Sequence, residues 1–241
     1  MKVTDFIIDT INKLPKGYVF TYEYFITKVS KKEAIIKALN RMVAAGKITK
    51  LAKGKYYKPE NTVFGTLEPK QYQVVKDLLE EDGKIVGYLT GLSIYNQLGL
   101  STQVSNTIQI GKNETRPKFK RDKYSIVVIR QKNNITKDNI PNLQLLDALR
   151  YIKKIPDTTL LDACVRFLAL LKPLSPKELS RLIKLAMVYP PSTRALLGAL
   201  LDEMGKNEES TVLLASLNPI TTYNFKGVAK VLSQTEKWNI R

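Results

Sequence analysis

The stretch that decides the fold is Ser30-Lys31-Lys32-Glu33-Ala34-Ile35-Ile36-Lys37-Ala38-Leu39-Asn40-Arg41-Met42-Val43-Ala44-Ala45-Gly46. Ser30 and Glu33 have the spacing of a capping box, in which each side chain bonds to the backbone N–H of the other residue. Gly46 is the residue type that most often follows the last turn of a helix. The pattern therefore predicts a helix that begins after Ser30 and runs to about Ala45.

This predicted helix has two unlike faces. At 100° per residue, the apolar side chains gather on one face: Ile35, Ile36, Leu39, Met42 and Val43. Small side chains and long hydrogen-bond donors gather on the other: Glu33, Ala34, Lys37, Asn40, Arg41 and Ala44. Asn and Arg can hydrogen-bond to base edges in a major groove, and Lys31 and Lys32 lie at a helix N-terminus, which favours phosphate. The helix is expected to read DNA through Lys37, Asn40 and Arg41.

The flanking residues complete a known order of elements. A helix over 4–13, a short strand at 18–20 and a helix over about 22–29 are expected before this helix. Two short β-type runs around Gly54 follow it and predict a hairpin with lysines at its tip and strands: Lys50, Lys53 and Lys55. This is the order of a winged helix-turn-helix whose wing grips backbone phosphate, and it predicts a DNA-binding domain over residues 1–60. The alternative is a winged helix that contacts only proteins.

The charge of the chain points the same way. The 241 residues carry a formal net charge of +17. Residues 1–60 hold thirteen Lys or Arg and five Asp or Glu, whereas residues 201–241 hold five of each. Such a balance predicts a polyanionic partner, with nucleic acid ahead of an anionic membrane surface or an acidic protein. A Lys-rich proteome is the alternative explanation.

Several kinds of chemistry are excluded. The chain has no histidine, which removes Ser-His-Asp and Cys-His catalysis. Its one cysteine, Cys164, lies in an apolar run and is expected to be a buried thiol. The carboxylates Glu80, Glu81 and Asp82 are expected at the solvated end of a helix rather than around a metal. The sequence therefore predicts no catalytic residue, no metal and no cofactor, and a DNA-processing enzyme is the weaker alternative.

The chain shows no signal peptide and no membrane-spanning segment, and a cytoplasmic protein without a membrane partner is expected. Residues 61–69 contain two prolines and no clear period, and they are predicted to be a linker. Residues 70–241 are then a second, larger domain. The fold class is therefore α+β: a winged helix-turn-helix plus a mixed domain with a small β-sheet and a C-terminal helical half.

Within this second domain, Thr90 to Gly99 resembles a capped helix. Strands are expected near 107–130, at 107–111 and 124–130. Helices are expected from 143 onward, over about 143–154, 158–171, 176–188, 192–204 and 208–216. Ser175 and Glu178 form another capping box at the start of one of them.

The residues between the two strands form a second candidate basic patch. Its members are Lys112, Arg116, Lys118, Lys120, Arg121 and Lys123. Such a loop suits nucleic acid or an acidic protein, and a solvated hairpin loop explains it equally well.

Four segments resemble the AbiEi-type antitoxins of type IV toxin–antitoxin (abortive infection) systems in bacteria. They are the N-terminal winged helix, the run from Tyr88 to Val104, the segment 192–201 (Ser-Thr-Arg-Ala-Leu-Leu-Gly-Ala-Leu-Leu) and the closing Trp238-Asn239-Ile240-Arg241. Ser105 is a departure, because the family is expected to have proline there. The resemblance covers most of the chain.

This resemblance implies a specific function. Such antitoxins repress their own promoter by binding inverted repeats in double-stranded DNA through the winged helix. Their C-terminal domain counters a nucleotidyltransferase-like toxin, without needing to bind it stably. The resemblance therefore implies a transcriptional regulator that is also an antitoxin, and a winged-helix adaptor or interaction protein is the alternative.

Overall fold

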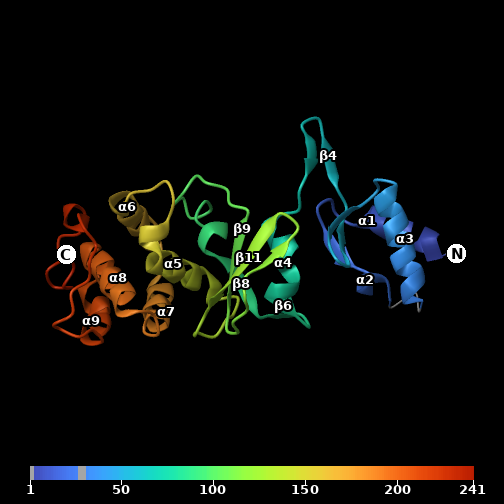
Figure 1. Cartoon of the computed structure of the whole chain (residues 1–241). Coiled ribbons are helices and arrows are strands. Elements are labelled where there is room, and N and C mark those ends of the chain that lie inside the picture. The colour runs from blue at the N-terminus through green and yellow to red at the C-terminus, as the bar shows by residue number, and fades with distance from the viewer. Residues whose placement is uncertain (1–2, 27–30) are drawn as a thin grey trace. The chain divides into compact units, whose positions relative to one another are not determined.

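The computed structural model describes residues 3–26 and 31–241, and it has the mixed α+β class that the sequence predicts (Figure 1). Two compact units divide the chain. Unit 1 comprises residues 1–78 and 119–124, and unit 2 comprises residues 79–118 and 125–241. Each unit has its own hydrophobic core.

Unit 1 begins with the elements predicted from the sequence, in the predicted order. They are α1 (Val3–Lys13), β1 (Val19–Thr21), α2 (Glu23–Ile26), α3 (Lys32–Ala44), β2 (Thr49–Ala52) and β3 (Lys55–Tyr57). After α3, Gly46 has a φ of 68°. Glycine adopts this left-handed conformation without strain because it has no Cβ atom. The backbone N–H of Lys47 then donates to the carbonyl of Met42, so the helix ends where the sequence predicts. The capping serine, Ser30, lies outside the described residues.

The three strands form one antiparallel sheet in the order β1-β3-β2. β1 pairs with β3 from Val19 opposite Tyr57 to Thr21 opposite Lys55. One face of this sheet and the apolar faces of the helices bury a common core. Its members include Ile7, Ile11, Phe20, Phe25, Ile35, Leu39, Ile48 and Tyr56. The hydrophobic spacing that predicts α3 therefore also holds it against the sheet.

The segment predicted to be a linker contains a β-hairpin instead. β4 (Glu60–Thr62) pairs with β5 (Gly65–Leu67), with Glu60 opposite Leu67. At the turn between them, Val63 and Phe64 are 93% and 98% exposed. Because no face of this hairpin is buried, its sequence lacks the alternation that reveals a strand. The segment 61–69, predicted to be a linker, therefore contains a hairpin that its sequence does not reveal.

Unit 1 also extends beyond the predicted boundary at residue 60. It includes α4 (Gln71–Leu79) up to Leu78, together with the segment 119–124 that contains β10 (Phe119–Arg121). Arg121 donates to both carboxylate oxygens of Asp77 and to the carbonyl of Val74, and Tyr124 donates to Glu68. These side-chain bonds tie a distant stretch of chain to α4 and to the segment just before it.

Unit 2 contains a small sheet in which β9 (Thr107–Lys112) lies between two partners. It pairs antiparallel with β8 (Gly87–Thr90) and parallel with β11 (Tyr124–Arg130). Before this sheet, β6 (Glu80–Glu81) and β7 (Lys84–Ile85) form a hairpin. Its turn is Asp82-Gly83, with positive φ at both residues. Glu80 and Glu81 therefore lie on a strand and not at the predicted helix end.

The helix expected over Thr90 to Gly99 is wrong. β8 continues to Thr90, and only a short 3-10 helix, η1 (Gly91–Ser93), follows. Gly91 has a φ of 55°, and a Cβ there would lie 1.9 Å from the Gln109 side-chain oxygen. Thr90 does not cap the turn, because its hydroxyl donates to the buried carboxylate of Asp147.

The C-terminal helices confirm the helical half predicted from residue 143 onward. They are α5 (Ile140–Arg150), η2 (Ile152–Lys154), α6 (Leu160–Leu171), α7 (Pro176–Ala186), α8 (Pro191–Glu203), α9 (Asn207–Ala215) and η3 (Val228–Lys230). The predicted capping box at Ser175 and Glu178 is present at the start of α7. Cys164 is buried as predicted, and burial raises the pKa of its thiol to about 11.

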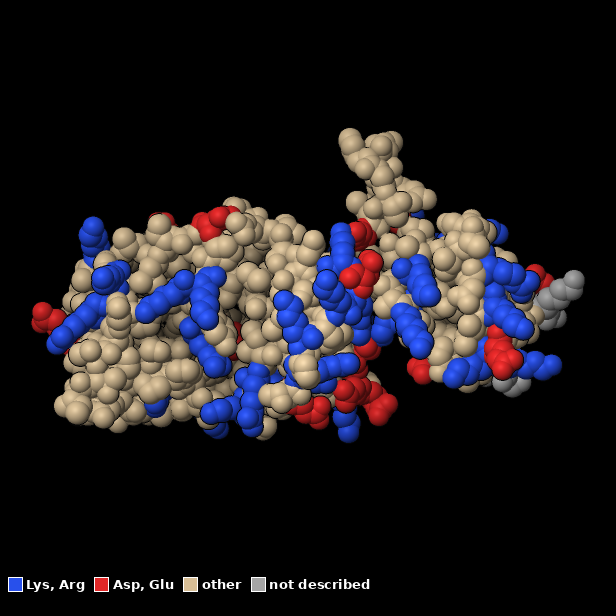
Figure 2. Space-filling model, viewed as in Figure 1, with Lys and Arg blue, Asp and Glu red and all other residues tan. Residues whose placement is uncertain are grey.

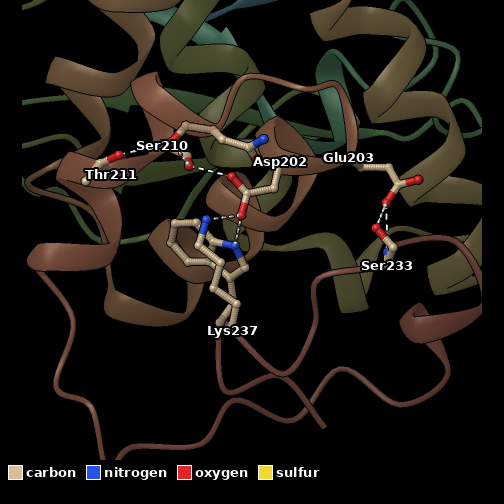
Figure 3. Close-up of polar contacts among 8 residues, drawn as sticks. Asp202, Glu203, Ser210, Thr211, Ser233 and Lys237 are labelled. Carbon is tan, nitrogen blue, oxygen red and sulfur yellow. Dashed lines mark hydrogen bonds and ion pairs between the residues drawn. The ribbon is translucent and has the colours of Figure 1, made fainter.

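Asp202 of α8 anchors the C-terminal tail to the helices (Figure 3). Its carboxylate accepts hydrogen bonds from Ser210, Lys237 and the indole N–H of Trp238. The Trp238 ring is fully buried, and a Cβ on Gly198 would lie 2.0 Å from it. This contact gives Gly198 a packing role in the middle of α8.

Candidate nucleic-acid interface

The outer face of α3 presents the residues predicted to contact DNA. Ile35, Ala38, Leu39 and Met42 are buried in the core of unit 1, so the opposite face points outward. Exposed residues on or just before this helix include Lys31, Lys32, Lys37, Asn40 and Arg41. Figure 2 shows Lys and Arg side chains along this helix. The structure thus leaves five of the predicted residues exposed along one helix, with Lys37, Asn40 and Arg41 on the face away from the core.

The cations of this face are not neutralised by acids. Across residues 3–26 and 31–241, no ion pair joins an acid to Lys31, Lys32, Lys37 or Arg41. Lys32 lies over the Tyr22 ring, 4.7 Å from its centroid. Arg41 makes a long contact with the Thr4 hydroxyl, at 3.5 Å. An anion that approaches α3 therefore meets several charges that remain available.

The Asn40 side chain is held by a residue of the unit 1 sheet. The hydroxyl of Tyr56 on β3 donates to the Asn40 amide oxygen at 3.1 Å. The amide nitrogen remains able to donate outward. This hydrogen bond fixes the orientation of the amide with respect to the sheet.

The predicted wing lysines separate into two kinds. Lys50 and Lys53 are exposed on the β2–β3 hairpin. The Lys55 ammonium instead lies 3.0 Å from Asp77, and only 18% of its side chain is exposed. The prediction that Lys55 grips phosphate together with Lys50 and Lys53 is therefore corrected. An acid on the helix α4 holds Lys55, and the spacing of residues around Lys55 does not reveal this contact.

Asp77 holds two cations at once. Arg121 approaches it at 2.6 Å and Lys55 at 3.0 Å. Burial alone raises the pKa of this carboxyl, but the hydrogen bonds and charges of Arg121 and Lys55 outweigh burial. The net pKa of Asp77 therefore lies below its usual value.

The second candidate patch, from Lys112 to Lys123, is not one continuous basic surface. Arg121 is buried, Lys112 pairs with Glu81 at 3.1 Å, and Lys123 pairs with Glu68. Lys112, Arg116 and Lys118 belong to unit 2, whereas Lys120, Arg121 and Lys123 belong to unit 1. Lys112, Arg121 and Lys123 thus have acidic partners, and the expected basic loop is corrected to a set of structural ion pairs with a few exposed cations.

Comparison with known proteins places the chain in a family. A family model described as a family of unknown function (DUF6088) matches residues 6–177. This chain belongs to the DUF6088 family. No curated protein matches this DUF6088 member in sequence. Its fold is similar to that of the RV2827C protein from Mycobacterium tuberculosis, with 16% identity and a TM-score of 0.63. The alignment covers 97% of this chain and 88% of the mycobacterial protein, and at this identity it shows the fold alone.

Other features of this DUF6088 member bear on what it can do. Within residues 3–26 and 31–241, no group of three or more acidic or cysteine side chains is placed to hold a metal. In the same part of the chain, no helix is both long and apolar enough to span a membrane.

Unit 2 of this DUF6088 member contains a buried polar network that the sequence does not reveal. The Asp147 carboxylate accepts hydrogen bonds from Tyr88, Thr90 and Tyr189, at 2.7 to 2.8 Å. The Gln131 amide donates to both tyrosine hydroxyls. Burial raises the pKa of Asp147 despite these bonds, and burial also raises the pKa values of both tyrosines. The members come from four separate segments, so no local motif could have identified them.

Proposed function

We propose that this protein is a DNA-binding transcriptional autorepressor. In this proposal, unit 1 is a winged helix-turn-helix, α3 lies in a major groove, and the β2–β3 hairpin lies on backbone phosphate. The observation that carries it is the exposed face of α3, where Lys37 and Arg41 flank Asn40 without acidic partners in the described chain. Long donors among small side chains suit base edges in a major groove.

The phosphate contacts follow from the same surface. Lys31 is the N-cap of α3 and Lys32 is its first residue, where backbone N–H groups and the helix dipole also favour an anion. Lys50 and Lys53 form the second set of contacts, on the hairpin. Lys55 is not included, because Asp77 already neutralises it.

The test measures DNA binding by the full chain. Fluorescence anisotropy is recorded with the promoter fragment upstream of the gene and with random duplex of the same length. The double variant Lys37→Ala/Arg41→Ala is expected to weaken promoter binding by about 1–3 kcal/mol per lost base contact, and random binding less. The variant Lys50→Ala/Lys53→Ala is expected to weaken both and to lower the salt slope by about 0.9 per lost phosphate contact.

The matched control is Lys172→Ala/Lys177→Ala, which removes two exposed lysines from unit 2. It changes the net charge equally and is expected to leave the promoter preference intact. Promoter binding equal to that of the wild type in Lys37→Ala/Arg41→Ala at physiological salt would exclude the groove assignment.

We further propose that the protein is an antitoxin that counters a nucleotidyltransferase-like toxin. This role does not require a stable complex between the two proteins. Support comes from the resemblance to AbiEi-type antitoxins in the run from Tyr88 to Val104, in 192–201 and in the closing four residues. These segments lie in unit 2, apart from the DNA-contacting residues. Co-expression with a nucleotidyltransferase-like protein encoded beside this gene tests it. Full-length Lys37→Ala/Arg41→Ala should still protect growth while repressing its promoter less, and failure of the wild type to protect growth would exclude the antitoxin role.

One observation favours a second function, an interaction module. The turn of the β4–β5 hairpin exposes Val63 and Phe64 almost completely, and exposed apolar side chains are typical of protein contacts. A pull-down that compares wild type with Val63→Ser/Phe64→Ser tests this alternative. It gains support only if a partner is lost while promoter binding is unchanged.

A further inference from the structure

Three hollows in unit 2 share one side chain, Arg150 at the end of α5. Their volumes are about 330, 490 and 380 Å³. The first and second also share Arg130, at the end of β11, and the second and third share Lys154. The shared side chains place the three hollows next to one another on one surface around Arg150.

This surface is strongly basic. Five cations from β11, the segment just after it, α5 and η2 line it: Arg130, Lys132, Arg150, Lys153 and Lys154. No carboxylate lines any of the three hollows, and in the described part of the chain none of the five cations forms an ion pair. Among the five, within residues 3–26 and 31–241, only Lys153 is committed to a hydrogen bond, which it donates to the carbonyl of Asn224. An anion can therefore meet four available charges here.

The first hollow has a rigid floor. Gln131 and Tyr189 line it, and both belong to the buried network around Asp147. The backbone N–H of Gln131 donates to the backbone carbonyl of Lys112, and the Gln131 side-chain oxygen accepts from the backbone N–H of Asn133. Arg130 and Lys132, on either side of Gln131, are therefore attached to a fixed segment of backbone. Such preorganisation reduces the entropy lost when a ligand binds.

The second hollow has a different lining. Leu92, Tyr95 and Val128 contribute apolar walls, whereas Arg130, Arg150 and Lys154 contribute charge. A ligand that fits both hollows thus has an anionic end and an organic body. The volumes lie in the range of small-molecule sites, roughly 300–1,000 Å³.

We propose that this surface binds a nucleotide, with its phosphates between Arg130, Lys132 and Arg150 and its nucleoside against the apolar wall of the second hollow. Guanidinium groups match phosphate oxygens with two parallel hydrogen bonds. A single-stranded nucleic acid fits less well, because such strands need exposed rings for base stacking. The Tyr151 ring is instead contacted by Arg150 and Lys154.

This site is independent of the proposed DNA contacts, because all of its residues belong to unit 2. The two proposals can therefore fail separately. Isothermal titration calorimetry with the full chain, at physiological salt, uses ATP, GTP, CTP, UTP and pyrophosphate as separate probes. At least one triphosphate is expected to bind saturably, and pyrophosphate is expected to compete with it.

Two variants locate the binding. Arg150→Ala and Lys132→Ala should each lower the affinity for the triphosphate by roughly tenfold or more, since each removes a charge-assisted hydrogen bond. Lys172→Ala, which removes an exposed lysine outside the hollows, and Lys37→Ala/Arg41→Ala should leave binding unchanged. Melting curves without ligand show whether each variant is folded, and Lys132 is exposed enough to test the site should Arg150→Ala be unstable.

Three results would overturn the proposal. The first is no saturable binding of any triphosphate at about 1 mM, a weak-affinity limit. The second is wild-type affinity in both Arg150→Ala and Lys132→Ala. The third is a short single-stranded oligonucleotide that binds the hollows more tightly than every free triphosphate, which would assign them to a nucleic-acid strand.

Discussion

Two pairs of basic side chains in unit 1 have the same charge and different surroundings. Lys37 and Arg41 lie exposed on α3, and no acid pairs with them in the described chain. Lys55 and Arg121 converge on one carboxylate, that of Asp77, and their side chains are 18% and 8% exposed. The first pair is available to a ligand, whereas the second pair holds the unit together.

This difference teaches that a count of Lys and Arg residues overestimates the charge that a binding surface offers to a ligand. Lys55 and Arg121 contribute to the +17 of the chain as much as Lys37 and Arg41 do. A cation with an acidic partner has little remaining attraction for a polyanion. Substitutions at the two pairs should therefore move different measurements: stability for one, DNA affinity for the other.

The largest expected effect is on stability, at Arg121. Arg121→Ala leaves Asp77 without its bidentate partner and the Val74 carbonyl without its side-chain donor. Breaking such a pair is expected to lower the unfolding free energy by roughly 2–4 kcal/mol, somewhat less than for a wholly buried pair. Urea unfolding of the full chain measures it. Arg41→Ala is the matched control and should change stability by less than about 0.5 kcal/mol; equal effects at the two arginines would contradict the comparison.

The pH dependence of stability is the next largest effect, and it depends on Asp77. Its pKa is lowered in the folded state. The resulting stabilisation is therefore complete above the ordinary carboxyl pKa and is lost as pH falls through the lower folded-state value. The stability difference between wild type and Asp77→Asn should be constant from about pH 5 to 8 and should shrink below about pH 4. A difference that stays constant down to about pH 2 would mean that the ion pairs do not stabilise the folded chain.

A smaller effect should separate two neighbouring wing lysines. Lys55→Ala removes a half-buried ion pair and should cost about 1 kcal/mol of stability. Lys53→Ala removes an exposed lysine and should lower the salt slope of DNA binding by about 0.9 without changing stability. Urea unfolding and salt-dependent anisotropy on both variants test this. The reverse assignment would return Lys55 to the phosphate-contacting set.

The sequence predicts those parts of the molecule in which one contiguous segment carries the whole signal. The apolar spacing in α3 and the capping box at Ser175 are such cases, and both elements begin and end close to the predicted residues. The exposed face of α3 follows from the same spacing, because burying Ile35 and Leu39 turns Lys37 and Arg41 outward.

The sequence does not predict contacts between distant segments. Asp77 lies 22 residues from Lys55 and 44 from Arg121, and nothing local marks it as their partner. Thr90 has the sequence context of a helix cap, but its hydroxyl donates a hydrogen bond to Asp147, 57 residues away. The sequence does not reveal the hollows around Arg150, because their cations come from β11, the segment after it, α5 and η2 and meet only in the folded chain.

The smallest expected effect on DNA binding is at Tyr56, which donates a hydrogen bond to Asn40 of the proposed reading face. Tyr56→Phe removes the hydrogen bond to the Asn40 amide and should cost about 0.5–1.5 kcal/mol of stability. It should weaken promoter binding less than Asn40→Ala, because the Asn40 amide can still donate to a base. Anisotropy and urea unfolding on both variants measure this. If Asn40→Ala loses stability but keeps full promoter affinity, Asn40 belongs with Lys55 and Arg121 as a structural residue, and the reading face is reduced to Lys37 and Arg41.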